Sequence, residues 1–498
     1  MSFPEAHPEL RMTCSHRSRV LIARLALLTL PVLAGCERPL APTDLGFVTK
    51  WTKAHYALAR AERLSPPVAS RLTAYAAVAL YEGWAAFSDS LKSLAGQLNG
   101  LDSLPHPVQK DRYDPALVAL EAQTAVLRSL YKEGFASTQV TITALHDSLL
   151  GARMLQGVTA EIRDRSLSYG GALGQAILAW AARDGFLSRT FTYQPIKGEQ
   201  YWIPTVTQAQ YRSQMLSMDR DFVGLDNPTA AARPGKMGDR SITVDRPKRA
   251  GNTTTPGINL TVALEPHWGE QRFFVRQAGD GCAAPPPPDF SRAPGSEFEK
   301  AAREVYEIGV HLTPEQRQIA YFWADNPGES GTPAGHWLSA LSSIASEWKL
   351  SSERTVEAYA LTALAVADGF TASWREKFRS NLLRPVTYIQ RYIDPKWQPL
   401  LITPSFPTYT SAHSTQSRAA AEVLTGLFGD HRAYDDSTHI TLGHPVKHVT
   451  SFLEAANEAG VSRLYGGIHF RFDHLGGQAL GACVGRAVLA HVHTRATP

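Results

Sequence analysis

Apolar residues recur at helical spacing through most of the 498-residue chain, and one long stretch interrupts the pattern. Alanine, leucine and glutamate are frequent in the periodic segments, and these residues favour helices over strands. From residue 190 to about residue 295, proline, glycine and threonine increase and the periodicity is lost. The predicted fold class is therefore mainly α. The segments expected to be helical are 54–87 (with a break at Pro66-Pro67), 115–131, 137–150, 159–184, 297–309, 314–323, 336–349, 352–383, 414–428, 451–459 and 475–494.

The same patterns divide the chain into parts. A stretch as long as 191–295 without periodicity is uncommon inside a compact domain. It is therefore expected to wrap the helical body or to shape the mouth of a cleft. The predicted parts are a lipoprotein signal peptide (1–35), a tether (36–50), an N-terminal helical bundle (51–190), an irregular connecting region (191–295) and a C-terminal helical region (296–498).

The N-terminus has the pattern of an export signal. Arg17, Arg19 and Arg24 precede an apolar stretch over 25–34 that is too short to span a bilayer. The stretch runs into Leu-Ala-Gly-Cys36, which resembles the bacterial lipobox, in which the cysteine is lipidated. Lipid chains hold a soluble domain at a membrane surface without spanning it. In the alternative, an ordinary small-residue cleavage site, Cys36 has no such role.

The compartment follows from the same resemblance. Glu37 after the cysteine favours the outer membrane, so the chain is expected to be exported and lipid-anchored at the periplasmic side. Cys282 and Cys483 would pair there as a disulfide or remain as two buried free thiols, and the sequence leaves both open.

The charge balance and the lack of long apolar runs argue against two classes of protein. Net charge is +4, from 50 Lys and Arg against 46 Asp and Glu, and removal of 1–35 leaves 46 against 44. A nucleic-acid binder would need a concentrated basic face, so no nucleic-acid partner is predicted. No run of about 18 apolar residues exists, which argues against a polytopic membrane protein. Membrane attachment is therefore expected only through the lipid.

Three segments of the C-terminal half carry residues from which chemistry can be inferred. In the first, Lys377 and Arg384 are seven residues apart, which places them on one helical face, and Pro385 is expected to end that helix. The second runs from residue 404 to His413, where Ser411 is a natural N-cap and the free N–H groups of the first turn form an anion site. Taken singly, these segments would be an exposed basic face and a plain capped helix.

The third segment covers residues 462–473. Gly466-Gly467 permits a tight backbone, and His469 and Asp473 are four residues apart. Asp473 is therefore expected to accept the Nδ1–H of His469 and to fix which ring nitrogen faces the cleft. Taken singly, the segment would hold a structural histidine.

Together the segments resemble the superfamily of type 2 phosphatidic acid phosphatases and vanadium-dependent haloperoxidases, in its bacterial haloperoxidase-like branch. The family pattern is Lys-x6-Arg-Pro, then Pro-Ser-Gly-His, then Ser-Arg-x5-His-x3-Asp, and the first and third blocks match in full and in order. The middle block departs twice, with Thr410 in place of Pro and Ala412 in place of Gly. Ala412 keeps the amide donor if its φ is negative, whereas a positive φ would be strained.

The resemblance implies a site for a tetrahedral oxyanion, which is vanadate as a cofactor or phosphate as a substrate. His469 is the implied ligand of vanadium or the nucleophile toward phosphorus, and His413 is the acid–base group on the opposite side. Guanidinium groups suit the oxygens of such an anion. The implied catalytic residues are His413, His469 and Asp473, and the implied oxyanion-binding residues are Lys377, Arg384, Ser411, Ala412 and Arg463.

Length and the absence of spanning helices favour one activity of this superfamily over the other. Its membrane phosphatases have spanning helices that are absent here, and its soluble phosphatases are much shorter. Over roughly residues 50–490 the chain resembles the longer bacterial haloperoxidase-like proteins, which implies two packed helical bundles with long irregular connections. The expected function is vanadium-dependent oxidation of a halide by hydrogen peroxide, with a small organic acceptor. The alternatives are a phosphomonoesterase with a phospho-histidine intermediate, and a non-catalytic oxyanion-binding lipoprotein if Ala412 distorts its loop.

Further residues have open interpretations. Phe406 matches an aromatic residue that lines the halide side in chloride-oxidising relatives, or it is a core residue. Asp325 or Asn326 corresponds to an acidic partner of His413, or both belong to a surface turn. Four histidines cluster loosely between the second and third segments and are interpreted as a polar loop over the cleft rather than a metal site. They are His431, His439, His444 and His448.

Overall fold

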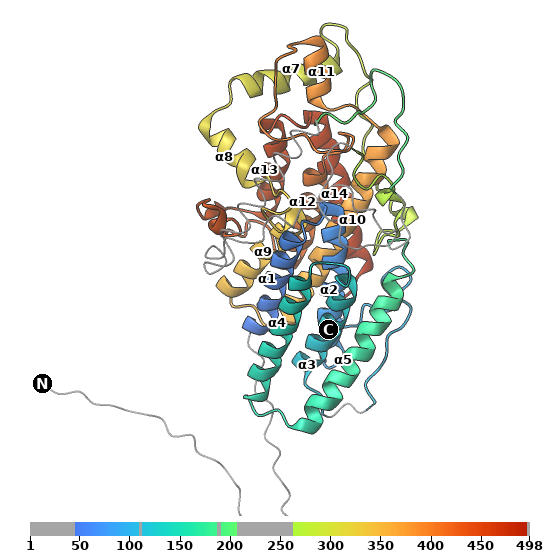
Figure 1. Ribbon diagram of the computed structural model, residues 1–498, viewed down its shortest axis with the longest axis vertical. Coiled ribbons are helices and arrows are strands. Elements are labelled where there is room, and N and C mark those ends of the chain that lie inside the picture. Colours follow the sequence, from blue (N-terminus) through green and yellow to red (C-terminus); the bar gives the residue numbers. More distant parts are fainter. Residues whose placement is uncertain (1–44, 109–111, 187–190, 207–261, 496–498) are drawn as a thin grey trace, which may run out of the picture. The chain divides into compact units, whose positions relative to one another are not determined.

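Two groups of helices make up the body of the protein in the computed structural model, which describes residues 45–108, 112–186, 191–206 and 262–495 (Figure 1). In one group α2, α3, α4 and α5 pack together, and in the other α10, α12, α13 and α14 do so. The prediction of a mainly α fold with two packed bundles is confirmed. The helices are α1 (Leu45–Ala61), α2 (Pro66–Ala85), α3 (Pro115–Leu130), α4 (Ala136–Met154), α5 (Ala160–Ala181), α7 (Glu297–Val310), α8 (Pro314–Phe322), α9 (Thr332–Glu347), α10 (Ser352–Ser380), α11 (Pro385–Tyr392), α12 (Ala412–Phe428), α13 (Phe452–Tyr465) and α14 (Arg471–His491).

The two groups meet where α2 contacts α10. Both helices are buried over most of their length, which fits sequences that are apolar around the whole helix. A proline begins α2, where its missing N–H is not needed. Ser351 caps α10 by accepting a hydrogen bond from the backbone N–H of Arg354 at 3.1 Å. This core fixes the position of the C-terminal end of α10, which carries Lys377.

A row of small residues brings α14 close to α12. A Cβ on Gly481 would overlap the carbonyl oxygen of Thr415, and Gly477 and Gly485 lie against the same helix. Since α14 follows the third motif directly and α12 follows the second, this close contact brings the two motifs together.

The described parts of the connecting region contain two short 3-10 turns, η3 (Trp268–Glu270) and η4 (Ala278–Asp280). Asp368 of α10 accepts hydrogen bonds from the backbone N–H groups of Phe274 and Val275 at 2.6 and 2.9 Å. Cys282 and Cys483 form a disulfide, which decides between the two alternatives left by the sequence and ties the region to α14. The described parts of the region that hold these contacts therefore pack on the helical body.

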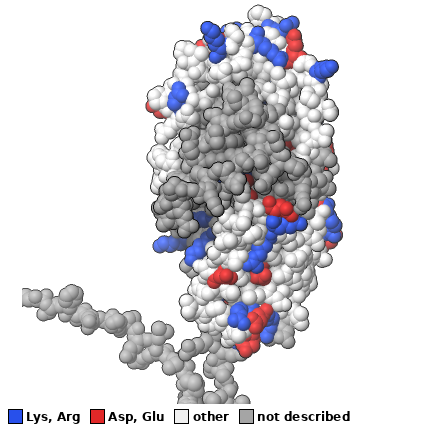
Figure 2. Space-filling model, viewed as in Figure 1, with Lys and Arg blue, Asp and Glu red and all other residues white. Residues whose placement is uncertain are grey.

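A short hairpin precedes α13. Strand β1 (Tyr434–Asp436) pairs antiparallel with β2 (Lys447–Val449), and the 3-10 turn η5 (Ile440–Leu442) lies between them. In the part of the chain that the structure describes, no helix has both the length and the apolar character needed to cross a bilayer. On the face drawn in Figure 2, basic and acidic side chains lie beside one another rather than in separate areas.

Some predictions concern the chain ends and boundaries. The signal peptide (1–35), Cys36 and the tether up to residue 44 lie outside the described residues. The division at residues 190 and 295 stays a prediction.

Candidate active site

Lys377 and Arg384 lie on two different helices. α10 ends one residue before Asn381, whose backbone is left-handed with φ 48°, and Pro385 is the first residue of α11. The prediction that both cations share one helical face, with Pro385 ending the helix, is therefore wrong. The cations nevertheless converge, because Lys377 Nζ and Arg384 Cζ each lie 4.8 Å from the centre of the Phe406 ring. Phe406 thus packs against both charged groups.

Arg384 is fully buried and is held by backbone carbonyls. Its Nε donates to Phe406 O at 2.9 Å and its Nη1 donates to Ile468 O at 2.7 Å. Its Nη2 is buried without a hydrogen-bond partner among the described residues. Burial lowers the pKa of Arg384 to about 9. The positive charge of Arg463 acts in the same direction, whereas the negative charge of Asp473 opposes this shift. A charged donor therefore stays available for a ligand.

Lys377 is also fully buried, but its ammonium group is already used. Nζ donates to the carbonyl oxygens of Pro407, Thr408 and Thr410 at 3.0, 3.0 and 2.6 Å. An ammonium has three N–H bonds, so these contacts use all of them. Burial and the nearby Arg384 hold the pKa of Lys377 well below its usual value. Lys377 therefore shapes the loop before α12, and it contributes charge rather than a free donor.

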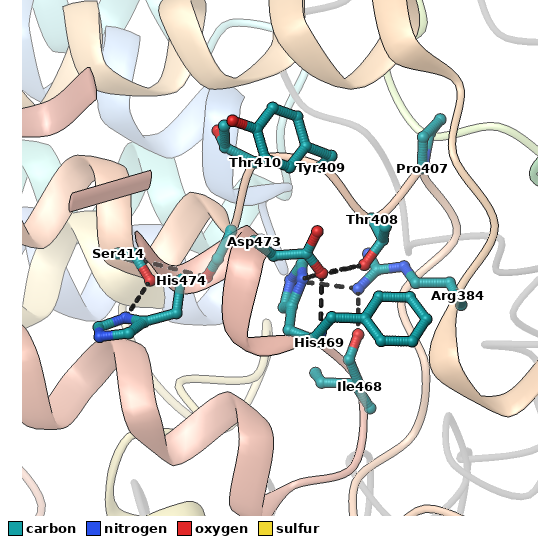
Figure 3. A network of polar contacts seen from close by, with 12 residues as sticks. Arg384, Pro407, Thr408, Tyr409, Thr410, Ser414, Ile468, His469, Asp473 and His474 are labelled. Carbon is teal, nitrogen blue, oxygen red and sulfur yellow. Dashed lines mark hydrogen bonds and ion pairs between the residues drawn. The ribbon is translucent and has the colours of Figure 1, made fainter. Parts of the chain in front are cut away.

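The contacts of His469 define its tautomer (Figure 3). Nε2 lies 3.1 Å from Arg384 Nη1, and a guanidinium can only donate, so Nε2 carries a lone pair. Nδ1 must then carry the proton, and it donates to Asp473 Oδ2 at 2.9 Å, as expected from the spacing. Burial lowers the pKa of His469 well below its usual value, and Arg384 and Lys377 act in the same direction. The ring is therefore neutral, with Nε2 as its basic atom.

Asp473 organises the end of this segment. It lies in the first turn of α14, whereas His469 precedes that helix. Its Oδ2 also accepts from Phe470 N at 2.9 Å and from Thr408 Oγ1, while its Oδ1 has no partner among the described residues. Burial raises the pKa of Asp473 to about 6, against the effect of these hydrogen bonds and of Lys377. The sequence offered no signal for Thr408, which links the second motif to the third.

The start of α12 is built as predicted. Ser411 Oγ accepts from Ser414 N at 3.3 Å, and the N–H of Ser411 donates to Asp473 O at 3.0 Å. Ala412 is the first residue of the helix, and its φ is not positive. The alanine in place of the family glycine is therefore not in the left-handed conformation that would strain it.

His413 and Arg463 meet at the backbone of Trp323. Arg463 Nη1 donates to Trp323 O at 2.8 Å, and Arg463 Nε has no partner among the described residues. Burial lowers the pKa of Arg463 to about 10, against the charge of Asp325. Burial and Arg463 hold the pKa of His413 well below its usual value, again against Asp325. His413 is therefore neutral, and its buried Nε2 also lacks a partner within the described residues.

Asp325 is not part of a surface turn, so that alternative is wrong for this residue. It is 4% exposed, and its Oδ2 lies 2.9 Å from His336 Nδ1 while its Oδ1 lies 3.0 Å from His439 Nε2. Burial alone would raise the pKa of Asp325, but the two imidazoles hold it well below its usual value. Asn326 instead donates to Glu329 Oε2 at 2.8 Å.

The interpretation of the four histidines as a polar loop holds only in part. His431 and His448 are exposed, and His448 Nδ1 lies 3.0 Å from Asp435 Oδ1. His439 is buried beside Asp325, so for this residue the interpretation is wrong. The loop therefore delivers one histidine to the interior.

The residues described above form one buried cluster of cationic and imidazole groups. The side chains of Lys377, Arg384 and Arg463 bring three cationic groups together, and Asp473 is the carboxylate among them. Buried charges need a compensating partner, and unpartnered nitrogens of Arg384, Arg463 and His413 are present. A small anion with several oxygens would satisfy the two arginine nitrogens. Because His469 and His413 are both neutral, it would also meet two potential bases.

Comparison with known proteins places this site in a family. Residues 392–497 match the family model of the VCPO second helical-bundle domain. The crystal structure of the first bacterial vanadium-dependent iodoperoxidase is 32% identical to the chain, with a TM-score of 0.75, and the match covers 93% of this chain and 99% of that one. The chain belongs to the vanadium-dependent haloperoxidase family.

Two more distant relatives agree with this fold. A holo-type bacterial vanadium-dependent chloroperoxidase has a TM-score of 0.61 at 15% identity, covering 91% of this chain and 99% of that one. The vanadium chloroperoxidase of Curvularia inaequalis is 24% identical over 296 residues, which are 46% of this chain. That alignment spans 49% of the fungal protein, about half of its length.

Proposed function

We propose that this protein is a vanadate-dependent haloperoxidase that oxidises a halide with hydrogen peroxide at a site centred on His469. The observation that carries the proposal is the pair of contacts of His469, from Nδ1 to Asp473 and from Nε2 to Arg384. Its Nε2 is a basic nitrogen because Arg384 can only donate to it, and it lies among the buried side chains of Arg384, Lys377 and Arg463. A neutral imidazole whose other nitrogen donates to a carboxylate is the usual form of a histidine that ligates a metal centre.

The residues present fit vanadate. Arg384 Nη2 and Arg463 Nε are buried donors without partners among the described residues, and they suit two of its oxygens. Ser411 and the amide of Ala412 add the start of a helix, which favours anions. Lys377 contributes charge while it holds the loop. When bound, vanadate supplies Lewis acidity that activates hydrogen peroxide toward a halide.

His413 is proposed as the proton-transfer residue. Its Nε2 is buried and unpartnered among the described residues, and the low pKa of the ring leaves it neutral. A neutral imidazole can take a proton from hydrogen peroxide as the peroxide binds and return it as water leaves. The Asp325 charge opposes the lowering of the pKa of His413, which keeps some basicity at this ring.

Iodide is the halide we propose first. The solved relative at 32% identity is described as an iodoperoxidase, and iodide is the most easily oxidised of the common halides. Phe406 packs against Trp374 with ring centres 4.8 Å apart and lies under both Lys377 and Arg384. This supports a structural role for Phe406 beside the cations more than a direct role in halide choice. A small organic acceptor is expected to take the oxidised halogen.

The test is an activity assay on the purified chain after removal of phosphate. Oxidation of iodide, bromide and chloride by hydrogen peroxide is measured with and without added orthovanadate. We expect halide oxidation that requires vanadate and is lost in His469→Ala. Halide oxidation without added vanadate that survives this substitution would contradict the proposal.

A phosphatase is the second candidate, because the same basic Nε2 of His469 could attack phosphorus. Hydrolysis of a phosphomonoester is therefore assayed in parallel. Hydrolysis that vanadate inhibits, with no halide oxidation, would replace the first proposal by the second. Binding of vanadate without either turnover would support the non-catalytic alternative.

The location of the protein is also a proposal. The arginine-led apolar stretch and Cys36 support export and lipid attachment at the periplasmic side of the outer membrane. The disulfide between Cys282 and Cys483 is compatible with an oxidising compartment.

A further inference from the structure

A second cluster of buried ionisable side chains lies against the ring of Trp323. It consists of two carboxylates and two imidazoles that come from separate elements. Asp325 follows α8, His336 belongs to α9, Asp436 ends β1, and His439 directly precedes η5. All four are at most 4% exposed. The proposed haloperoxidase site does not use His336, Asp436 or His439, so their burial needs another explanation.

The nitrogen and oxygen atoms of three of these residues converge on one point. Single ligand atoms of Asp325, His336 and His439 all lie within 4.8 Å of one another. A tetrahedral zinc ion with bonds of 2.0–2.1 Å holds its ligand atoms about 3.3 Å apart. The contacts from Asp325 to the two rings, 2.9 and 3.0 Å, are already close to this spacing. Small side-chain shifts would therefore admit an ion.

His439 lies close to Asp325, but its ring N–H is poorly aligned for a hydrogen bond. Its Nε2 lies 3.0 Å from Asp325 Oδ1, yet neither ring nitrogen of His439 nor this oxygen has a hydrogen-bond partner among the described residues. The two atoms are close, but the N–H direction does not point at the oxygen. Convergence without donor alignment is what two ligands of one ion show.

His336 is held as metal-binding histidines are held. Its Nδ1 faces Asp325, and its other nitrogen, Nε2, lies 2.8 Å from Asp436 Oδ2. A ligating histidine almost always donates its second N–H to a carboxylate or carbonyl, which fixes the tautomer and the ring plane. The Trp323 ring also stacks on His336 at 4.5 Å. Asp436 and Trp323 thus keep Nδ1 aimed at the convergence point.

Charge leads to the same ligand class. Asp325 and Asp436 bring two negative charges into a buried region, and both ring nitrogens of His336 face one of these carboxylates. Without an ion, a proton on each nitrogen of His336 balances one of the two charges. A divalent cation in place of the proton on Nδ1 would balance both carboxylates and leave the ring neutral, which is the form that binds metals. Lys447 lies over the neighbouring Phe322 ring but pairs with Glu458 at 2.8 Å, so it does not supply this balance.

We propose that Asp325, His336 and His439 bind one divalent first-row transition metal ion, with Zn²⁺ as the representative, and that Asp436 is a positioning residue for His336. Two imidazoles and one carboxylate suit such ions better than Mg²⁺ or Ca²⁺, which prefer oxygen ligands. Asp325 also acts through its charge on His413 and Arg463 of the oxyanion site, but His336 and His439 do not belong to that site, and metal binding can be tested without the proposed function.

The first test is metal binding by the full chain without a histidine tag and without vanadate. The protein is stripped with EDTA and titrated with Zn²⁺ by calorimetry and with Co²⁺ by visible absorption. We expect one tightly bound ion per chain and a d–d spectrum of nitrogen and oxygen ligation. Absence of saturable binding by the folded wild-type chain would overturn the proposal.

Variants locate the ion. His439→Asn is expected to weaken Zn²⁺ binding at least tenfold and to abolish the Co²⁺ spectrum. The matched control is His448→Asn in the same hairpin, an exposed histidine that should bind as the wild type does. Asp436→Asn should weaken binding about 10- to 100-fold with the Co²⁺ spectrum retained, because it leaves all three ligands in place. Wild-type affinity in folded His439→Asn would overturn the assignment, and if this variant does not fold, unchanged affinity in Asp436→Asn would do so.

Discussion

The tautomer of His469 can be tested by two substitutions at Asp473 that separate geometry from charge. Asp473→Ala removes the acceptor of His469 Nδ1, Phe470 N and Thr408 Oγ1. Asp473→Asn can keep an oxygen at the same place, with its NH₂ group at the position of Oδ1. Since Oδ1 has no partner among the described residues, no existing contact is lost there.

The expected change in vanadate affinity differs between the two variants. Without an acceptor, Nδ1 no longer holds the proton, so Nε2 is less often the basic atom. Loss of such a partner typically lowers metal affinity 10- to 100-fold, which is about 1.4–2.7 kcal/mol. In Asp473→Asn the tautomer is kept and one negative charge beside the anion is removed. Vanadate affinity should therefore stay within about threefold or increase.

The stabilities of the two variants are expected to fall for separate reasons. Asp473→Ala leaves buried donors without an acceptor, at about 1–3 kcal/mol each. Asp473→Asn buries an unpartnered NH₂ group, with a similar cost for one group. Both variants are therefore titrated with orthovanadate by calorimetry at a temperature where each is folded, as judged by its unfolding curve.

The matched control is Asp435→Asn, an exposed carboxylate in β1 that contacts His448. It should leave vanadate affinity unchanged. If Asp473→Asn loses as much affinity as Asp473→Ala, the carboxylate acts through its charge and the tautomer argument is wrong. Wild-type affinity in Asp473→Ala would also refute the argument.

Three further predictions concern charge, pH and location. Arg463→Lys keeps the positive charge but cannot reproduce both the Nη1 contact and the Nε donor that has no partner among the described residues. Vanadate affinity measured by calorimetry should therefore fall about tenfold. Unchanged affinity would remove Arg463 from the site. Burial raises the pKa of Glu82 to about 7 from an ordinary 4.5. The folded state therefore binds this proton more tightly than the unfolded state does. The free energy of unfolding should fall by up to about 3 kcal/mol as pH rises from about 4.5 through 7. Urea unfolding of Glu82→Gln should lack this dependence, and an identical pH profile would contradict the burial argument. Cys36→Ser should move the protein from the membrane fraction to the soluble fraction of cells, whereas continued membrane association would exclude lipidation as the anchor.

Much of the helical fold could be predicted because apolar periodicity and caps are local. The expected segment 159–184 agrees closely with α5, and the break at Pro66-Pro67 falls where α2 begins. The helix expected over 451–459 continues to Tyr465, because Gly460 serves close packing instead of ending the helix. A Cβ on this glycine would overlap the His474 ring. Whether a glycine ends a helix or admits a neighbour depends on tertiary contacts that the local sequence does not contain.

The residues of the oxyanion site could be predicted where their separation along the sequence matches the motif. The spacing from His469 to Asp473 gave the correct hydrogen bond although the two are not on one helix. The spacing from Lys377 to Arg384 gave the wrong local structure, since Asn381 can adopt the left-handed conformation that ends α10. The use of Lys377 by three carbonyls could not be predicted, because those carbonyls belong to a loop about 30 residues later.

The cluster around Asp325 shows where spacing carries no information. Asp325 and Asp436 are 111 positions apart and act on opposite nitrogens of His336. No periodic relation links them, and only the packing of α9 against β1 brings them together. Trp323 then connects this cluster to the oxyanion site, because its carbonyl accepts from Arg463 while its ring stacks on His336. Binding of an ion at one site should therefore change affinity at the other, and by linkage the effect must be reciprocal.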